Sequence, residues 1–407
     1  MTIAFQSCDA DVIVAGGGPC GTFLANLLGQ AGLSCLLLEK RTEDPAASMA
    51  IGVMPPSLYR FEQAGLAASV VAAGCPVQRA RVMTETAQLG VLDLNHLPPP
   101  FNFILSIPES DLLRILRNGL NTRPSVRLLT GQEVSAIRQT NDGVMIETRN
   151  AETNALSAFS ARFAVACDGH RSAVRDCVGI SSEGISYRPS FVMGDFPDST
   201  PWEGEARLYF TPTGSLESFP LPQGRRRWVA QTNPSQANAA TLVRRVEAVT
   251  GHALDARQAE WVTPFTPVRR LCRSYFTGRV ALCGDAAHVM SPIGGQGMNT
   301  GFADAWHLSA ILRRLCATGE PSTPLFARYD RCRRRAFTMA ANRAACGMWL
   351  GTLSGRMASS VRGAFIRHVL FGTPLRHHLA AYFTMMTISD EDPLQGGGSS
   401  GRPIHDT

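Results

Sequence analysis

The segment from residue 11 to residue 39 constrains the fold more than any other part of the chain. Two short apolar runs, residues 12–15 and 35–38, predict strands, and leucines spaced by three or four residues between them predict a helix. The turn from the first strand into the helix fits the pattern G-x-G-x-x-G, with glycines at Gly16, Gly18 and Gly21. Such glycines allow a tight turn, close approach of a pyrophosphate and close packing of helix on strand. The segment therefore predicts a βαβ unit that binds a dinucleotide at its helix N-terminus.

Glu39 ends the second predicted strand, at roughly the 20-residue offset that such sites have. A carboxylate there accepts hydrogen bonds from a ribose and repels a 2′-phosphate, so the site suits FAD or NAD rather than NADP. Lys40 follows at the same adenosine end. A second match, formed by Gly396, Gly398 and Gly401, has no predicted strand before it and no predicted helix after it, and we interpret it as part of a tail.

A second glycine-rich segment lies at residues 279–301. An apolar run stops at Gly284 and Asp285, and a helical pattern begins near Met298 and Asn299. The loop between them contains Pro292, Gly294, Gly295 and Gly297. A strand that stops at a carboxylate and opens into a glycine-rich turn is suited to a polar, phosphate-bearing ligand. We therefore expect one long cofactor, bound by two turns that are far apart in the sequence.

Composition narrows the classes of function. The 407 residues are 44% hydrophobic and 18% charged, which is typical of a globular protein. The net charge of +6 comes almost entirely from scattered arginines, and the densest run, residues 331–335, is interpreted as the solvated face of a helix, so nucleic-acid binding is disfavoured. Eleven cysteines form no C-x-x-C pair and no cluster with histidine, which predicts no metal site, reduced thiols and a cytoplasmic protein. The longest apolar runs are too short to span a bilayer.

Taken together, the motifs resemble those of the single-component FAD-dependent aromatic hydroxylases, the monooxygenases typified by para-hydroxybenzoate hydroxylase. The resemblance rests on the first glycine turn, Glu39, Asp168-Gly169, Gly284-Asp285 and the run Pro292-Ile293-Gly294-Gly295-Gln296-Gly297-Met298-Asn299. It implies that Asp285 binds the ribityl chain of FAD and that the loop at residues 292–297 passes the isoalloxazine ring. It also implies that the helix starting near Met298 points its N-terminus at the N1/O2 edge of the flavin. Asp168 would lie near the pyrophosphate, with capping of the following helix as the alternative.

One residue departs from the family pattern. Many relatives carry Arg or Gln where this chain has Glu109, just before a helix that we predict over residues 111–120. The resemblance implies that this side chain touches FAD. Because a carboxylate donates no hydrogen bond unless it is protonated, we expect Glu109 to accept hydrogen bonds from ribityl hydroxyls, or the flavin to be placed differently.

The predicted architecture is an α/β fold with a Rossmann-like FAD-binding βαβ domain of the glutathione-reductase type, an antiparallel β-sheet lobe for the substrate, and C-terminal helices. The FAD-binding domain is assigned to residues 1–75, 101–184 and 269–320, and the substrate lobe to residues 76–100 and 185–268. Residues 321–389 are the C-terminal helices, and we expect those at residues 357–386 to pack on the FAD-binding domain, with a dimer face or a membrane-surface contact as alternatives. Residues 390–407 predict a disordered tail.

The resemblance also implies a reaction. NADPH or NADH would bind transiently and reduce FAD, and O2 would then form a flavin C4a-hydroperoxide that inserts one oxygen atom into an aromatic or polycyclic small molecule. The protein would position the ring, exclude water and select the substrate, and the sequence identifies no catalytic side chain. Three side chains of the antiparallel lobe are candidates for an apolar substrate pocket, with ordinary core packing as the alternative: Tyr209, Phe219 and Leu221.

Three other functions stay open. An FAD-dependent reductase of isoprenoid-like substrates would share the fold without inserting oxygen, and a non-catalytic scaffold would bind FAD without turnover. A halogenase is less favoured, because the chain lacks a W-x-W-x-x-P segment and its only lysine, Lys40, lies at the adenosine end. We expect no nucleic-acid partner, and either a monomer or a homodimer.

Overall fold

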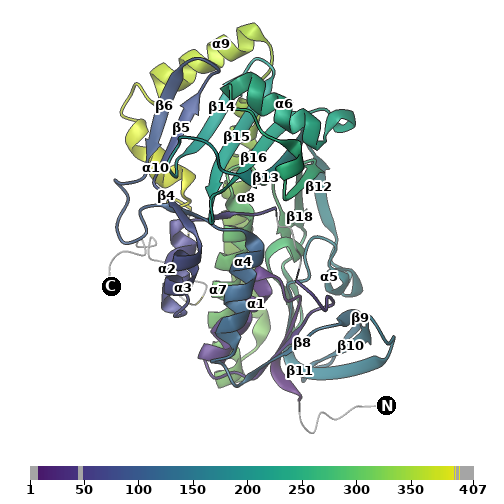
Figure 1. The fold of residues 1–407 in the computed structure, drawn as a ribbon. Helices are drawn as coiled ribbons and strands as arrows, with labels where there is room; N and C mark the ends of the chain where they lie inside the picture. The colour runs from purple at the N-terminus through teal and green to yellow at the C-terminus, as the bar shows by residue number, and fades with distance from the viewer. Residues whose placement is uncertain (1–7, 45–48, 389, 391–393, 395–407) are drawn as a thin grey trace.

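The computed structural model describes residues 8–44, 49–388, 390 and 394 of the chain. Two lobes, each built on its own β-sheet, are stacked one above the other in Figure 1. The long helix α8 (Ser322–Thr352) contacts both lobes, because it packs against α7 (Gln296–Thr318) in the lower lobe and against β15 (Gly214–Leu221) in the upper one.

The sheet of the lower lobe has parallel central strands. Its eight strands are β1 (Ala10–Ala15), β2 (Cys35–Leu38), β8 (Val126–Leu129), β9 (Gln132–Gln139), β10 (Val144–Asn150), β11 (Leu156–Ala166), β19 (Phe276–Thr277) and β20 (Val280–Leu282). β1 lies between β11 and β2, and all three run parallel. Because β1 and β2 are buried along almost their whole length, both are continuous apolar runs. The βαβ unit expected at residues 11–39 is confirmed.

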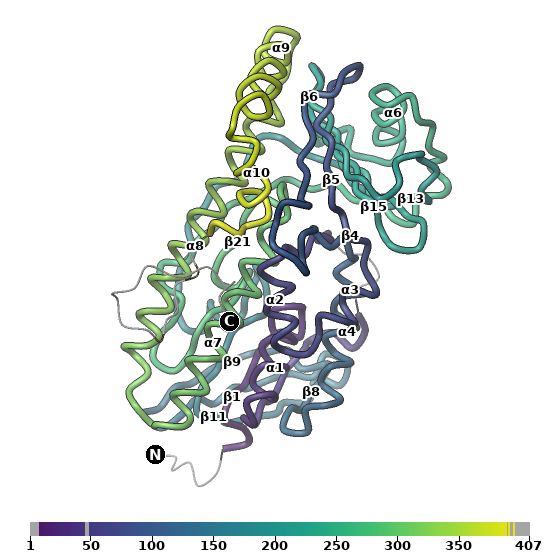
Figure 2. The backbone as a smooth tube through the Cα atoms, turned by 90° about the vertical axis from the view of Figure 1, so that its left-hand side faces the viewer, coloured from purple at the N-terminus to yellow at the C-terminus, as the bar shows by residue number. Residues whose placement is uncertain are grey.

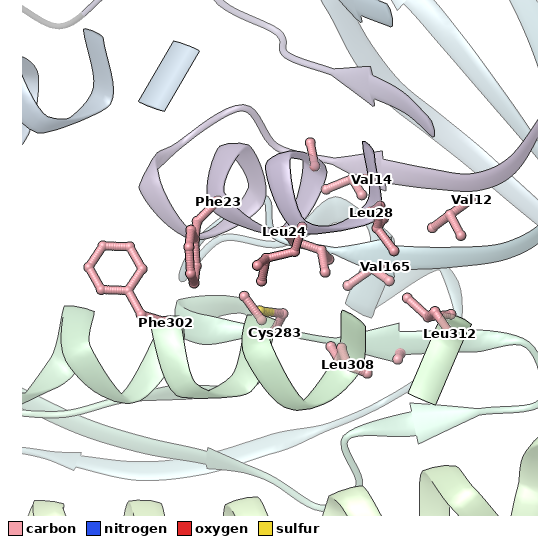
Figure 3. Packing of buried hydrophobic residues seen from close by; sticks show 14 of the residues in the cluster. Val12, Val14, Phe23, Leu24, Leu28, Val165, Cys283, Phe302, Leu308 and Leu312 are labelled. Atoms are coloured by element: carbon pink, nitrogen blue, oxygen red, sulfur yellow. The ribbon is translucent and has the colours of Figure 1, made fainter. Parts of the chain in front are cut away.

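The core of the lower lobe is the contact between α1 (Pro19–Gln30) and α7. Phe23 of α1 meets Phe302 of α7 edge-to-face, with ring centroids 5.6 Å apart. Figure 3 shows the neighbouring side chains of this contact, which come from α1, α7, β1 and β11 and from the residue after β20: Val12, Val14, Leu24, Leu28, Val165, Cys283, Leu308 and Leu312. The apolar stripe of each helix therefore packs against the sheet and against the other helix.

Short elements connect the lobes. The helices among them are α2 (Pro55–Gln63), α3 (Ala67–Ala73), α4 (Glu109–Leu120) and α5 (Ala173–Cys177). The strands form two small sheets, β3 (Gly52–Val53) with β7 (Ile104–Ser106) and β4 (Cys75–Val77), and β12 (Ser182–Ser186) with β18 (Val268–Cys272) and β21 (His288–Val289). α4 begins at Glu109, two residues before the predicted start, directly after Pro108.

The sheet of the upper lobe is largely antiparallel. It also contains β5 (Arg79–Met83), β6 (Gln88–Asp93), β13 (Ser190–Pro197), β14 (Ala206–Thr211), β16 (Arg225–Thr232) and β17 (Trp261–Phe265), in the order β17-β13-β16-β15-β14-β5-β6. One face is covered by α6 (Ala239–Thr250), whose Leu242 and Val246 pack on Trp228. The other face is turned toward the lower lobe, since Ile293 packs against Phe191 and Val229 there.

The C-terminal helices after α8 pack on the upper sheet. They are α9 (Arg356–Ala364), the π-helix η4 (Phe365–Leu370) and α10 (Arg376–Phe383), and Figure 2 shows them beside β5 and β6. Ile366 is buried against Val82 and Leu89 of these strands. Our expectation that these helices cover the FAD-binding domain is therefore wrong, because their apolar side chains find their partners on the upper sheet.

The last described residues also differ from our expectation. Asp390 forms ion pairs with Arg60 and Arg333, and Leu394 packs against the core of the lower lobe. At these two positions the chain is not a disordered tail, and the rest of that prediction, with Gly396, Gly398 and Gly401, lies outside the described residues. Within the described ranges, no helix combines the length and the apolar character that crossing a membrane requires.

Candidate cofactor site and its surroundings

The turn after β1 combines two crowded glycines with an open one. A Cβ atom at Gly16, whose φ is +107°, would lie 2.3 Å from the carbonyl oxygen of Cys167, and one at Gly21 would lie 1.9 Å from the carbonyl oxygen of Gly16. At Gly18 a Cβ would meet no atom of the described residues within 4 Å. Gly16 and Gly21 therefore serve packing, whereas Gly18 leaves space in front of α1, where the helix N-terminus favours a phosphate.

Glu39 lies beside this turn with a fixed orientation. Its side chain is buried, one carboxylate oxygen accepts the N–H of Gly17 at 2.7 Å, and the other accepts the N–H of Arg41 at 2.9 Å. The oxygen bound by Gly17 keeps a second lone pair with which it can accept a ribose hydroxyl. Lys40 is exposed next to it. The structure thus holds Glu39 at the predicted place, and its contact with adenosine stays a prediction, as does that of Lys40.

The loop after β20 brings a second helix N-terminus to the same region. Gly294 and Gly295 both have positive φ, which glycine adopts without strain, and the chain then enters α7. The first turn of α7 carries no acidic side chain, so its dipole is free to stabilise a negatively charged group. The loop positions predicted to lie at the ring are all at least partly accessible: Pro292, Gly294, Gly295, Gly297 and, in the first turn, Met298.

Asn299 anchors this helix start to the other side of the site. Its side-chain oxygen accepts the N–H of Met54 at 2.8 Å, and its amide donates to the carbonyl oxygens of Gly52 at 2.9 Å and Gly295 at 2.7 Å. The Asn299 side chain therefore positions the loop by binding the backbone, rather than reaching out to a ligand.

Glu109 and Asp285 interact across the region between α4 and β20. Desolvation raises the pKa of Glu109, and the negative charge of Asp285 raises it further. Desolvation also raises the pKa of Asp285, although this side chain is exposed. Solvent can reach the Asp285 carboxyl group, yet the surrounding protein raises its pKa by desolvation. The group therefore borders a recess enclosed by protein rather than the outer surface. The structure thus brings together Glu109 and Asp285, the two carboxyl groups that are predicted to contact FAD.

Asp168 follows β11 and lies beside Gly16. One carboxylate oxygen accepts the N–H of Val174 at 3.1 Å, in the first turn of α5. This contact agrees with the alternative in which Asp168 caps the helix that follows it. The other oxygen, Oδ1, is buried and has no hydrogen-bond partner within the described part of the chain. Desolvation raises the pKa of Asp168, although hydrogen bonds from Ser172 and Val174 act against this. Capping therefore leaves one acceptor available next to the glycine turn.

These features fit a long dinucleotide that contains a flavin. There is open space at Gly18, an acceptor at Glu39, an oxygen on Asp168 with no partner among the described residues, and, beside Asp285, a helix N-terminus whose first turn carries no acidic side chain. Comparison with known families decides the assignment, because residues 9–344 match the family model described as an FAD binding domain. The chain belongs to this FAD-binding family.

The chain is also similar to individual proteins, among them two monooxygenases and a Diels-Alderase. The chain is 29% identical over 318 residues to pentachlorophenol 4-monooxygenase of Sphingobium chlorophenolicum, covering 74% of this chain but only 58% of that protein. Its fold matches the crystal structure of p-nitrophenol 4-monooxygenase from Pseudomonas putida with a TM-score of 0.83 at 23% identity, covering 92% of this chain and 97% of that one. It also matches the Diels-Alderase PyrE3 of pyrroindomycin biosynthesis with a TM-score of 0.75 at 25% identity, covering 92% and 80%.

The residues predicted to line a substrate pocket lie on different faces of the upper sheet. Phe219 packs against the same buried cluster as Ile293, which belongs to the loop at residues 284–297, called the FAD loop below, on the face toward the lower lobe. Leu221 shares that face of β15 by alternation but is buried at the strand end, and its role stays a prediction. Tyr209 instead packs with Trp202 and Leu242 beneath α6. Tyr209 is therefore core, and its assignment to the pocket was wrong.

A buried network below the FAD loop was not predicted. Asp304 of α7 accepts from His288 at 2.6 Å, from Arg333 of α8 at 2.7 Å and from the N–H of Gly284 at 3.1 Å. Burial opposes ionisation of Asp304, but His288 and Arg333 outweigh it and hold the pKa of this carboxyl below its usual range. Because Gly284 precedes Asp285, the network fixes the turn that carries Asp285.

Arg333 corrects our interpretation of residues 331–335 as a solvated face. Arg331 and Arg335 are exposed, whereas the Arg333 side chain is only 3% exposed. The sequence did contain a signal, since position 333 falls four residues after Tyr329 and three before Ala336, within the apolar stripe of the helix. A cation in an apolar stripe requires a buried anion, and Asp304 supplies it.

Proposed function

We propose that this chain is an FAD-dependent monooxygenase that uses NADPH or NADH and O2 to insert one oxygen atom into an aromatic or polycyclic small molecule. When bound, FAD supplies the redox chemistry: it takes up reducing equivalents from the nicotinamide and activates O2. The observation that carries the proposal is the position of the FAD loop. Ile293, between the residues predicted to lie at the ring, packs against the buried cluster of Phe191, Met193 and Val229 on the upper sheet.

The residues of the chain have distinct tasks in this proposal. Gly18 and the N-terminus of α1 accommodate the pyrophosphate, Glu39 holds the ribose, and Asp285 holds the ribityl chain. The N-terminus of α7 stabilises negative charge at the flavin edge. The aromatic and aliphatic side chains around Ile293 exclude water and accommodate an aromatic ring.

The test is reconstitution with FAD followed by assays with NADPH and NADH and with phenols of increasing ring number. We expect a phenol to stimulate nicotinamide oxidation, and one oxygen atom of the product to derive from labelled O2. Product formation without O2 would indicate a reductase. Product formation without nicotinamide oxidation would indicate non-redox use of FAD, which the match to a Diels-Alderase makes a specific alternative. The mass of the purified protein would decide between monomer and homodimer, and the reduced thiols favour the cytoplasm.

A further inference from the structure

Glu217 is a carboxyl group in the middle of the upper sheet that the proposed function has not used. It lies on β15, directly opposite Leu208 of β14 and Val229 of β16. Alternation along β15 places Glu217 on the same face as Phe219, two residues later, and both Phe219 and Ile293 pack against the cluster that contains Val229. Glu217 therefore lies on the face of the sheet that is turned toward the predicted flavin.

The row across the sheet at this level is otherwise apolar or neutral. From Leu208 and Glu217 it continues through Val229 to Met193 of β13 and Thr263 of β17. No hydrogen bond or ion pair joins the Glu217 side chain to any described residue. A carboxyl group with no protein partner is costly on such a face, and the cost is offset when a ligand becomes its partner.

Charged groups on the neighbouring elements are occupied elsewhere. Arg227, on the same face of β16, forms a buried ion pair with Asp195 of β13 at 2.7 Å. β14 presents Leu208 and Phe210 on this face, which pack with the C-terminal helices. Arg343 of α8 donates to the carbonyl oxygens of Tyr382 and Thr387. β4 and β7 carry no acidic or basic side chain, only the thiol of Cys75 and the hydroxyl of Ser106.

The titration of Glu217 agrees with this isolation. Desolvation alone raises its pKa to about 7, and no neighbouring charge contributes. The side chain is nevertheless partly exposed, so that, like Asp285, it borders space enclosed by protein. A carboxyl group that titrates near neutral pH can both accept and return a proton at little cost, which is the property of a general base.

We propose that Glu217 contacts the substrate and accepts the proton of its phenolic hydroxyl group. The O–H bond of the phenol breaks, the proton moves to the Glu217 carboxylate, and the phenoxide oxygen keeps the electron pair. The phenoxide is a more electron-rich ring than the phenol and reacts faster with an electrophilic oxygen. Glu217 returns the proton when the product is released. This inference rests on the proposed function and adds to it the substrate class, a phenol with its hydroxyl toward β15.

The test compares the FAD-loaded wild type with Glu217→Gln and Glu217→Asp, using the exposed Glu247→Gln on α6 as a matched control on the opposite face. In the wild type, turnover should fall as pH drops through about 7, because protonated Glu217 cannot accept a proton. Glu217→Gln should lose this pH dependence and turn over un-ionised phenols about 100-fold more slowly. Glu217→Asp should keep a pH-dependent limb, and Glu247→Gln should match the wild type.

A second measurement separates a proton acceptor from a structural residue. Phenols that are already ionised at the assay pH need no base and are repelled by the Glu217 carboxylate. Glu217→Gln should therefore bind them more tightly than the wild type, measured by equilibrium titration, and retain most of their turnover. Equal losses with ionised and un-ionised phenols would overturn the role of Glu217.

The two levels of the proposal fail differently. If no phenol stimulates nicotinamide oxidation by the wild type, the proposed function fails and the role of Glu217 fails with it. If the wild type turns over and Glu217→Gln matches it at every pH, only the role of Glu217 fails. FAD content and thermal unfolding of each variant show whether a loss of turnover reflects misfolding. If Glu217→Gln does not fold, the pH profile of Glu217→Asp still tests the role of Glu217.

Discussion

The turn at residues 16–21 and the loop at residues 284–297, the proposed adenosine and flavin ends of the FAD site, are shaped by different means. At the first turn, backbone atoms alone set the shape, since any side chain at Gly16 or Gly21 would collide with a nearby carbonyl group. At the second loop, side chains from other elements hold the backbone: Asp304 binds the N–H of Gly284, and Asn299 ties Gly295 to Gly52.

This difference predicts which substitutions should harm the adenosine end and which should harm the flavin end of the proposed site. The adenosine end is specified by residues within a few positions of one another, so it is sensitive to added volume. The proposed flavin end depends on the ion pair between Asp304 of α7 and Arg333 of α8, so it should be sensitive to the loss of buried partners outside the loop itself. The following substitutions challenge that contrast, beginning with the largest expected effect.

Arg333→Leu removes the main cation from the network below the FAD loop. Asp304 would keep only His288 and a backbone N–H as partners, and we expect a loss of about 3–5 kcal/mol in the free energy of unfolding. Denaturant unfolding measures this loss. Arg331→Leu on the exposed face of the same helix is the control and should stay within about 0.5 kcal/mol of the wild type. Equal effects of the two substitutions would refute the idea that the loop at residues 284–297 depends on buried side chains of other elements.

Gly21→Ala adds a methyl group 1.9 Å from the carbonyl oxygen of Gly16. The turn must shift to accommodate it, which should cost about 1–3 kcal/mol of stability and abolish FAD retention during purification. Thermal unfolding and flavin absorbance of the purified protein measure both effects. A stable variant that retains FAD would show that the turn is more adaptable than its geometry indicates.

Gly18→Ala is the matched counterpart of the previous substitution, because its methyl group enters open space. We expect the apo protein to lose less than about 1 kcal/mol of stability, while the affinity for FAD falls about tenfold, since the methyl group occupies the approach of the pyrophosphate. Fluorescence titration with FAD gives the dissociation constant. An unchanged affinity would place the pyrophosphate elsewhere.

Glu109→Gln tests the proposed flavin end and has the smallest expected effect of the four substitutions. Above its raised pKa, Glu109 is ionised and repels Asp285, and neither group can donate to the cofactor. The amide should therefore tighten FAD binding about fivefold, or ~1 kcal/mol. Wild-type affinity should improve as pH falls toward the pKa of Glu109, and the variant should lose this trend. The exposed Glu62→Gln on α2 is the control, and a weaker FAD complex of Glu109→Gln would mean that the carboxylate is the preferred acceptor of ribityl hydroxyls.

The sequence was informative where structure is local. The βαβ unit and the start of α7 follow from apolar periodicity and glycine spacing, which act over a few residues. The face of a strand is harder to assign. Alternation places Tyr209 and Phe219 on definite faces of their own strands, but only the register, in which Tyr209 is opposite Leu216, shows that they point to opposite sides of the sheet.

The buried charges show the same limit. Arg333 stood out only as part of a basic run, and its partner Asp304 lies 29 residues away on another helix. Glu217 was not singled out in the sequence, because its isolation follows from what the neighbouring strands lack. Pairing and absence of pairing are properties of the folded molecule, and a single sequence does not contain them.

Asp390 has a practical consequence for anyone who shortens this protein. Cutting at residue 389 would look harmless, because the sequence beyond is rich in glycine and polar residues. Yet this one carboxylate joins Arg60, His307 and Arg333, which come from three different helices. Its removal would leave these basic groups facing one another without their shared anion. A trimmed protein should therefore keep residue 390, and a cut placed after Leu394 is the safer boundary.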